Sequence, residues 1–229
     1  MGRITSDTAP GVVETSLRRR FRVVESALTV GGRSIVIMHP ASAEDLIDER
    51  EFEQDERLPY WAELWPSARV LANRVLAMAP NGRTLLELGC GSGLVSTCAA
   101  LAGFDVVASD YYEDATRFAR VNAWRNGAAP PRTLMLDWRA LPALPRFDVV
   151  VASDVLYERP YGALVARAVA STLAPNGLAL IADPGRVARD EFVQALDALE
   201  LRVSRRQNVR YEDGSIRQTI TIFEIRRKG

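Results

Sequence analysis

A short apolar run that opens into alternating glycines, LLELGCGSG, occupies residues 85–93. Glycine at every second position lets the backbone turn sharply and approach a ligand closely, because no Cβ stands in the way. The dinucleotide fingerprint places its third glycine one residue later, at Leu94, where a helix N-terminus receives a pyrophosphate. Here the third glycine is Gly93. The segment therefore predicts a strand, a turn and a helix around a nucleoside that carries no phosphate.

Downstream of this turn, short β-branched runs alternate with longer helical segments. This alternation predicts right-handed βαβ crossovers and a mostly parallel sheet. Residues 201–208 and 218–225 alternate in period two around Gly214, so the chain is expected to close with an antiparallel hairpin. The prediction is an α/β fold with a doubly wound, mostly parallel, seven-stranded Rossmann-like sheet. Its parallel strands are expected at 84–88, 105–108, 133–136, 148–152 and 178–182, and its helices at 93–102, 112–126, 160–173 and 187–199.

The first 57 residues are predicted to form an extension packed on a single ligand-binding domain at 58–229. Residues 1–16 lack periodicity and are expected to be a loose arm. Residues 21–30 and 34–38 flank two glycines and predict a β-hairpin. Residues 42–56 predict an acidic helix, because residues 44–57 contain eight acids and two arginines. That helix is either a solvated surface or a contact for a basic substrate.

Acidic residues stand at the ends of the predicted strands around the glycine turn. Asp110 follows Gly91 by nineteen residues, which is the spacing of an acid that accepts hydrogen bonds from both ribose hydroxyls. The alternative role of Asp110 is a helix cap. S-adenosylmethionine fits this pattern, because it has an uncharged ribose and a cationic amino-acid end that Glu87 would face. Asp137 is expected to accept from the adenine amino group and Trp138 to cover the ring. A core position is the alternative for Trp138, but its place at the carboxyl end of a strand favours the ligand.

The fourth strand ends in ASDVLYE, residues 152–158. Methyl transfer is an in-line displacement at a sulfonium, so an enzyme mainly has to hold a neutral nucleophile about 3 to 3.5 Å from the methyl carbon. Asp154 would orient an amine through its remaining N–H, and Tyr157 would offer a hydroxyl and an aromatic face to the cation that forms.

An aromatic cluster, LPYWAELWPS, precedes the glycine turn at residues 58–67. Its aromatic side chains either pack the extension onto the sheet or line the pocket for cofactor and acceptor. Trp65 is the expected cofactor contact.

Together these motifs resemble the class I, seven-β-strand methyltransferases that use S-adenosyl-L-methionine, and within them the protein-lysine methyltransferases with a D-x-x-Y motif after the fourth strand. LELGCGSG, ASD, LDW and ASDVLY occur in the order typical of that family. The resemblance implies that Asp154 and Tyr157 are catalytic and face the acceptor. It implies that the cofactor contacts are Trp65, Glu87, Gly89, Gly91, Asp110, Trp138 and Ser153.

Two further segments, PYWAELWP and ADPGR at 182–186, are similar to the electron transfer flavoprotein β-subunit lysine methyltransferases. The fourth-strand motif of this chain reads DVLY, which departs from the usual variant of that group. The resemblance therefore leaves the acceptor open.

Composition narrows the classes of partner. Lysine plus arginine and aspartate plus glutamate both number 29, so no overall field attracts nucleic acid or an anionic membrane. The one local basic run, Arg18–Arg20, is expected at a solvated strand start. Cys90 and Cys98 are too isolated for a structural disulfide or a zinc site, so no metal is expected. A cytoplasmic monomer or weak dimer is expected, with no membrane span.

Three functions remain open from the sequence. The first is N-methylation of a lysine side chain on a protein substrate. The second is N-methylation of a small-molecule amine of the nicotinamide kind, which a closed pocket under the extension would favour. The third is a non-catalytic module that binds a nucleotide or a partner protein.

Overall fold

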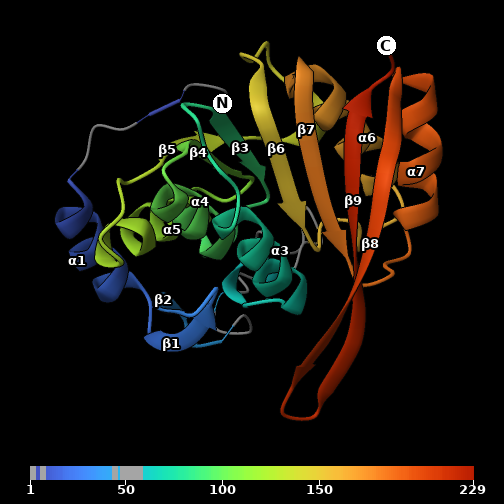
Figure 1. Cartoon of the computed structure of the whole chain (residues 1–229). Helices are drawn as coiled ribbons and strands as arrows, with labels where there is room; N and C mark the ends of the chain where they lie inside the picture. The colour runs from blue at the N-terminus through green and yellow to red at the C-terminus, as the bar shows by residue number, and fades with distance from the viewer. Residues whose placement is uncertain (1–3, 6–8, 43–45, 47–58) are drawn as a thin grey trace.

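A seven-stranded sheet forms the centre of the computed structural model, which describes residues 4–5, 9–42, 46 and 59–229 (Figure 1). The strand order is β5-β4-β3-β6-β7-β9-β8. The strands from β5 to β7 run parallel, whereas β9 lies antiparallel to both β7 and β8. This confirms the predicted fold class. The strands are β3 (Thr84–Leu88), β4 (Asp105–Asp110), β5 (Arg132–Met135), β6 (Phe147–Ser153), β7 (Leu173–Asp183), β8 (Leu201–Asp213) and β9 (Ile216–Arg227).

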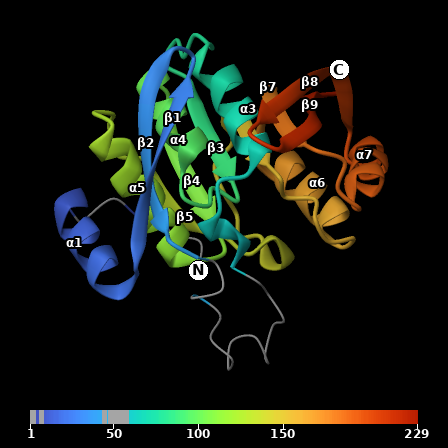
Figure 2. The same ribbon diagram turned by 90° about the horizontal axis from the view of Figure 1, so that it is seen from below.

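The helices cover both faces of this sheet, as Figure 2 shows from the edge where the parallel strands end. On β6, Val149 and Val151 belong to the core under α3 and α4, whereas Val150 and Ala152 belong to the core under α6 and α7. Alternate residues of a strand face opposite sides of a sheet, so a continuous apolar run is what a strand buried on both faces requires. The helices are α3 (Pro66–Leu76), α4 (Leu94–Ala102), α5 (Glu113–Arg125), α6 (Tyr161–Thr172) and α7 (Arg189–Ala198).

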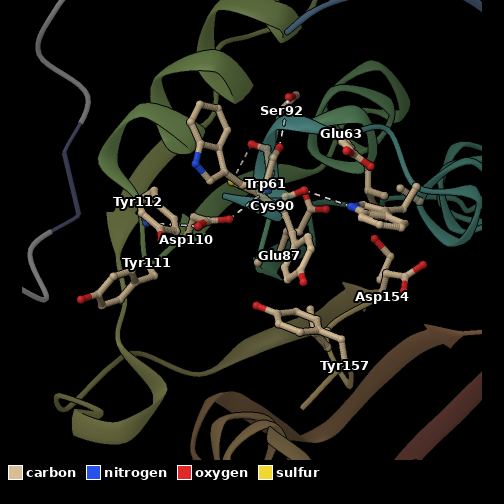
Figure 3. Close-up of a pocket in the computed structure, with 18 of the residues that line it drawn as sticks. Trp61, Glu63, Glu87, Cys90, Ser92, Asp110, Tyr111, Tyr112, Asp154 and Tyr157 are labelled. Atoms are coloured by element: carbon tan, nitrogen blue, oxygen red, sulfur yellow. Dashed lines mark hydrogen bonds between the residues drawn. The ribbon is translucent and has the colours of Figure 1, made fainter. Parts of the chain in front are cut away.

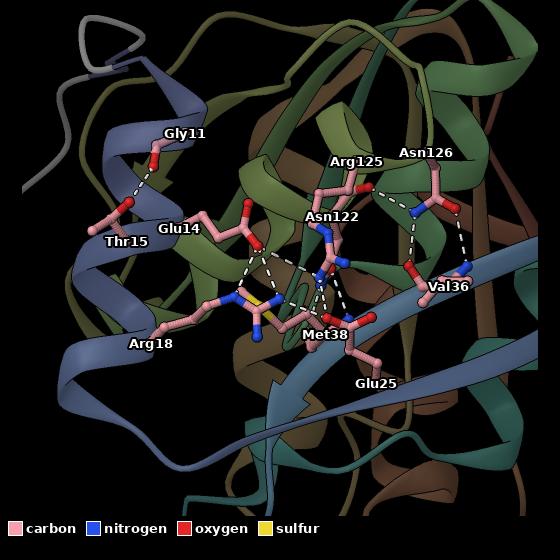
Figure 4. Close-up of polar contacts among 10 residues, drawn as sticks. All are labelled: Gly11, Glu14, Thr15, Arg18, Glu25, Val36, Met38, Asn122, Arg125 and Asn126. Atoms are coloured by element: carbon pink, nitrogen blue, oxygen red, sulfur yellow. Dashed lines mark hydrogen bonds and ion pairs between the residues drawn. The ribbon is translucent and has the colours of Figure 1, made fainter.

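The predicted N-terminal hairpin is present as β1 (Val23–Val30) and β2 (Arg33–Pro40), a separate two-stranded sheet. Two asparagines hold it, Asn122 in α5 and Asn126 directly after the end of that helix (Figure 4). The side chain of Asn122 bonds both the N–H and the C=O of Met38, and that of Asn126 bonds both backbone groups of Val36. These side-chain amides make the backbone hydrogen bonds that a neighbouring strand would otherwise make to β2, because each offers one donor and one acceptor.

The prediction of a loose arm is wrong for residues 10–16, since helix α1 spans Pro10–Arg20. Proline favours the first turn of a helix. Val13 and Leu17 lie four residues apart and are buried against Phe118 of α5. The basic run Arg18–Arg20 is thus the last turn of this helix and not a strand start, a place where positive charge favours the helix dipole. The predicted acidic helix at 42–56 lies almost entirely outside the described residues.

Within the described part of the chain, no helix combines the length and the apolar character needed to cross a bilayer.

Candidate functional site

The main pocket opens at the carboxyl ends of β3, β4 and β6, where the order of the strands along the chain reverses (Figure 3). Open α/β sheets bind ligands at such a point. The space between its walls, including the open solvent at its mouth, is about 1030 Å³. Its lining includes every site residue that the sequence analysis proposed: Trp65, Glu87, Gly89, Gly91, Asp110, Asp137, Trp138, Ser153, Asp154 and Tyr157.

The glycine turn forms the back of the pocket. Gly89, Gly91 and Gly93 have φ angles of 67°, 50° and 81°, values that side chains with a Cβ rarely adopt. A Cβ on Gly91 would lie 3.0 Å from the carbonyl oxygen of Trp61. Glycine is therefore needed both for the turn and for the close approach of neighbouring backbone.

Asp110 lies beside this turn at the end of β4 and is only 7% exposed. One carboxylate oxygen accepts the N–H of Gly91 at 3.0 Å, and the other accepts the N–H of Tyr112 at 3.1 Å. Burial raises the pKa of Asp110 to about 6. Tyr112 is the N-cap residue of α5, and no side chain caps this helix. The alternative role of Asp110 as a helix cap is therefore not found, and its bond to Tyr112 holds the turn that leads into the helix. The backbone N–H of Tyr111 is a third partner of this carboxylate. A carboxylate has about four acceptor positions, so about one remains for a ligand.

Glu87 is 1% exposed and accepts a hydrogen bond from the hydroxyl of Ser96. Burial raises its pKa to about 8, and the nearby Asp110 carboxylate adds to this shift. Without a ligand this carboxyl group therefore holds its proton at neutral pH. A cation brought into the pocket would favour its ionised form.

The titration of Glu87 predicts a dependence of stability on pH. Between its unfolded pKa near 4.5 and its folded pKa near 8 the native protein binds the extra proton, so stability falls as pH rises through this range. Glu87→Gln keeps an acceptor for Ser96 and removes the titration. We expect the thermal midpoint to fall less between pH 6 and pH 8 in this variant than in the wild type. Equal slopes would show that Glu87 does not titrate there.

At the end of β5, Asp137 and Trp138 lie where the adenine is expected, but Asp137 is already engaged. Its carboxylate accepts from the backbone N–H of Arg139 at 2.9 Å and from the Arg139 guanidinium at 2.8 Å. The Trp138 ring lies 3.5 Å from the position of a Cβ on Gly89 and meets the ring of Tyr161 edge to face at 5.7 Å. Trp138 is thus a wall of the pocket, whereas Asp137 has reduced capacity for a further donor.

Asp154 has an unusual backbone conformation, with φ at 58°. Its N–H donates to the carbonyl of Ala182 at 3.0 Å, which fixes this conformation. Left-handed backbone at a residue other than glycine is costly and is concentrated at functional sites. The carboxylate is 3% exposed and forms an ion pair of 2.6 Å with Nε of Arg186. The sequence did not indicate this pairing of Arg186 with Asp154.

Tyr157 belongs to a row of aromatic rings in the wall of the pocket. Its ring meets Tyr60 at 5.2 Å and Tyr161 at 5.0 Å, both edge to face. Burial raises the pKa of Tyr157 above its usual value, so its hydroxyl remains protonated. Tyr60 and Tyr161 were not predicted as site residues, and only Tyr60 carried a signal, as part of the aromatic cluster.

The two tryptophans of that cluster have different surroundings. Trp61 packs against Phe21 at 6.3 Å and Phe118 at 5.7 Å, so it joins the extension to α5. The Trp65 indole donates to the carbonyl of Tyr60 at 3.0 Å. Its ring lies 5.1 Å from the guanidinium carbon of Arg186. Trp61 and Trp65 both line the pocket, and Trp61 in addition packs the extension onto α5.

Comparison with known proteins agrees with this arrangement. A family model described as a methyltransferase domain matches residues 60–221. A ubiquinone biosynthesis O-methyltransferase from Bordetella avium is 30% identical over 109 residues, 44% of this chain and 43% of the relative. The electron transfer flavoprotein beta subunit lysine methyltransferase of Danio rerio is 32% identical over 133 residues, 56% of this chain and 51% of the relative. The chain thus spans about half the length of these curated relatives.

Among solved structures, the magnesium protoporphyrin IX methyltransferase of Synechocystis PCC 6803 with bound SAM has the same fold. The TM-score is 0.56 at 19% identity, over 80% of this chain and 94% of the other.

Proposed function

The chain belongs to the methyltransferase domain family, and from that membership we propose that it transfers a methyl group from S-adenosylmethionine to the side-chain amine of a protein lysine. One part of the pocket wall supports the choice of an amine as acceptor, and we assign it to the acceptor. There a nearly buried carboxylate, Asp154, stands beside the aromatic row of Tyr60, Tyr157 and Tyr161.

S-adenosylmethionine is the cofactor, and the residues present fit it. Gly89 and Gly91 allow the positive φ angles of the turn that lines the pocket. The Asp110 carboxylate lies beside this turn and can accept from the ribose. When bound, this cofactor supplies a methyl group made electrophilic by a sulfonium.

The chain's own residues have to hold and orient the acceptor nitrogen. The buried aromatic row favours the neutral amine, because desolvation lowers the pKa of an ammonium group. Asp154 can accept an N–H of that amine and so direct its lone pair. The methylated product regains a positive charge, which the Asp154 carboxylate and the faces of Tyr157 and Tyr60 stabilise. Methylation of a phenol oxygen gives a neutral product that would use neither feature.

The names of the relatives agree with both chemistries, since one relative acts on a lysine and the other is an O-methyltransferase. The test therefore asks which kind of molecule receives a labelled methyl group. Purified protein is incubated with tritium-labelled S-adenosylmethionine and a cell lysate, and the protein fraction is hydrolysed to amino acids. We expect the label in methylated lysine, and none with the Asp154→Asn variant. Label confined to small molecules or lipids, or no transfer at all, would rule the proposal out.

Asn122, which holds the N-terminal hairpin through Met38, also contacts the cofactor-binding turn. Its side chain donates to the carbonyl of Ser92 in the glycine turn at 2.8 Å. We expect Asn122→Ala to raise the Kd of S-adenosylhomocysteine about tenfold, equivalent to ~1.4 kcal/mol. Asn126→Ala is the matched control, since Asn126 clamps Val36 on the same strand without touching the turn. It is expected to change the Kd less than about threefold. Calorimetry on both variants measures this, and equal Kd values would contradict the link.

A further inference from the structure

Arg186 occupies a site that has the chemistry of a receptor for an organic cation. Its Nε lies 2.6 Å from Asp154, and its guanidinium carbon lies 5.1 Å from the centre of the Trp65 ring. A carboxylate on one side and an indole face within about 6 Å on the other is the arrangement that proteins use to bind ammonium and guanidinium groups. Both Asp154 and Trp65 line the main pocket.

The loop that carries Arg186 is firmly placed. One carboxylate oxygen of Asp183, a fully buried residue at the end of β7, accepts the N–H of Gly185 at 2.8 Å and the N–H of Arg186 at 3.1 Å. These bonds fix the backbone from which the arginine side chain reaches Asp154. The end of β7 therefore sets the position from which the Arg186 side chain reaches Asp154.

The two partners differ greatly in their access to water. The Asp154 side chain is 3% exposed, whereas that of Arg186 is 34% exposed. A buried carboxylate needs a cation at all times, because an unpaired buried charge is strongly destabilising. A half-exposed guanidinium loses little by returning to water. Arg186 can therefore be exchanged for another cation, but Asp154 cannot be left alone.

There is space for the arginine side chain to move into. A groove lined by Arg186, Pro184, Ile216 and Gln218 adjoins the pocket and shares Glu63 and Trp65 with it. Glu63 is exposed, so its carboxylate is available to a displaced guanidinium.

We propose that Asp154 and Trp65 form the subsite for the cationic head of the acceptor, and that Arg186 fills this subsite in the free enzyme as a substitute for it. This inference rests on the proposed lysine specificity and deepens it. An ammonium group can take the place of Arg186 and keep Asp154 paired. A neutral acceptor that displaced Arg186 would leave the carboxylate without a cation, so Arg186 selects for a charged acceptor. The ammonium binds in this way and loses its proton to solvent only transiently, for the methyl-transfer step, and the methylated product restores the positive charge beside Asp154.

Binding of a minimal cationic acceptor tests the proposal. Nα-acetyl-lysine methylamide is titrated into the protein saturated with S-adenosylhomocysteine. Removing the internal competitor in Arg186→Gln is expected to lower the Kd of this probe about fivefold or more. Asp154→Asn is expected to weaken binding, and Arg186→Gln on that background should bring no gain. Arg189→Gln is the matched control, since Arg189 lies on the same segment but pairs with Asp190; it should leave the Kd unchanged.

Two results would overturn the proposal. Weaker probe binding by Arg186→Gln would mean that Arg186 supports the acceptor and does not compete with it. A loss of affinity for S-adenosylhomocysteine in the same variant would mean that Arg186 binds the cofactor. The probe experiment measures binding and not transfer. A gain with the probe alongside label that never enters protein lysine would therefore reject the protein substrate and retain the cation subsite.

Discussion

Gly93→Ala is expected to destabilise the protein by about 2 to 3 kcal/mol more than a substitution that only strains the backbone. Gly93 has a φ of 81°, and a Cβ there would lie 2.3 Å from both Cα and Cβ of Ala119 on α5. Real side chains do not approach backbone that closely, so the glycine turn or α5 has to move. Urea unfolding monitored by circular dichroism gives the change in the free energy of unfolding, provided that the m-value stays constant.

Gly127→Ala provides the control for this prediction. Gly127 has nearly the same conformation, with φ at 78°, but a Cβ there would meet no atom within 4 Å. Its cost is the left-handed backbone alone, roughly 1 to 2 kcal/mol. If the two alanine variants proved equally stable, the close packing of the glycine turn on α5 would not be a determinant of this fold.

Asp154→Asn is expected to lower the rate of methyl transfer about a hundredfold or more, the range found when one polar group that stabilises a transition state is removed. Asparagine has nearly the same shape and tolerates left-handed backbone, so the strained turn at φ 58° should be retained. What is lost is the negative charge that orients the amine and stabilises the cation formed. Single-turnover assays with tritium-labelled cofactor and the acceptor found in the lysate measure the rate.

The cofactor should bind this variant as it binds the wild type, within about twofold, because Asp154 is assigned to the acceptor. Unchanged transfer by Asp154→Asn would remove Asp154 from the mechanism. A parallel loss of affinity for S-adenosylhomocysteine would move it to the cofactor side of the pocket.

The sheet and the pocket were predictable because both depend on short-range sequence patterns. A glycine turn has to follow its strand directly. Parallel strands end at the same edge of a sheet, so the positions of Asp110, Ser153 and Asp154 at that edge followed once the strands had been identified. The closing hairpin also followed from a two-residue period around Gly214. These signals lie within a few residues of the groups that they place.

The errors concern contacts between distant segments. Helix α1 was missed because only Val13 and Leu17 mark its apolar face, and two residues give no periodicity. It is stabilised by packing against α5, and tertiary packing routinely outweighs local signals.

The partners of Asp154 and Asp137 were missed for related reasons. Arg186 is 32 residues from Asp154 in the chain, and an ion pair across that distance leaves no mark in a single sequence. Arg139, by contrast, is close enough to Asp137 for a capping pattern to have indicated their bond.

The central claim is that the cofactor is held at the end of β4, and titration of S-adenosylhomocysteine into wild type and Asp110→Asn tests it most directly. Asparagine has one acceptor oxygen in place of two, so it cannot keep the N–H groups of Gly91 and Tyr112, which reach different oxygens of Asp110, and also accept from the ribose. We predict one-to-one binding by the wild type and a Kd about a hundredfold higher for the variant, which corresponds to ~2.7 kcal/mol. Equal Kd values, or no binding by the wild type, would contradict the account.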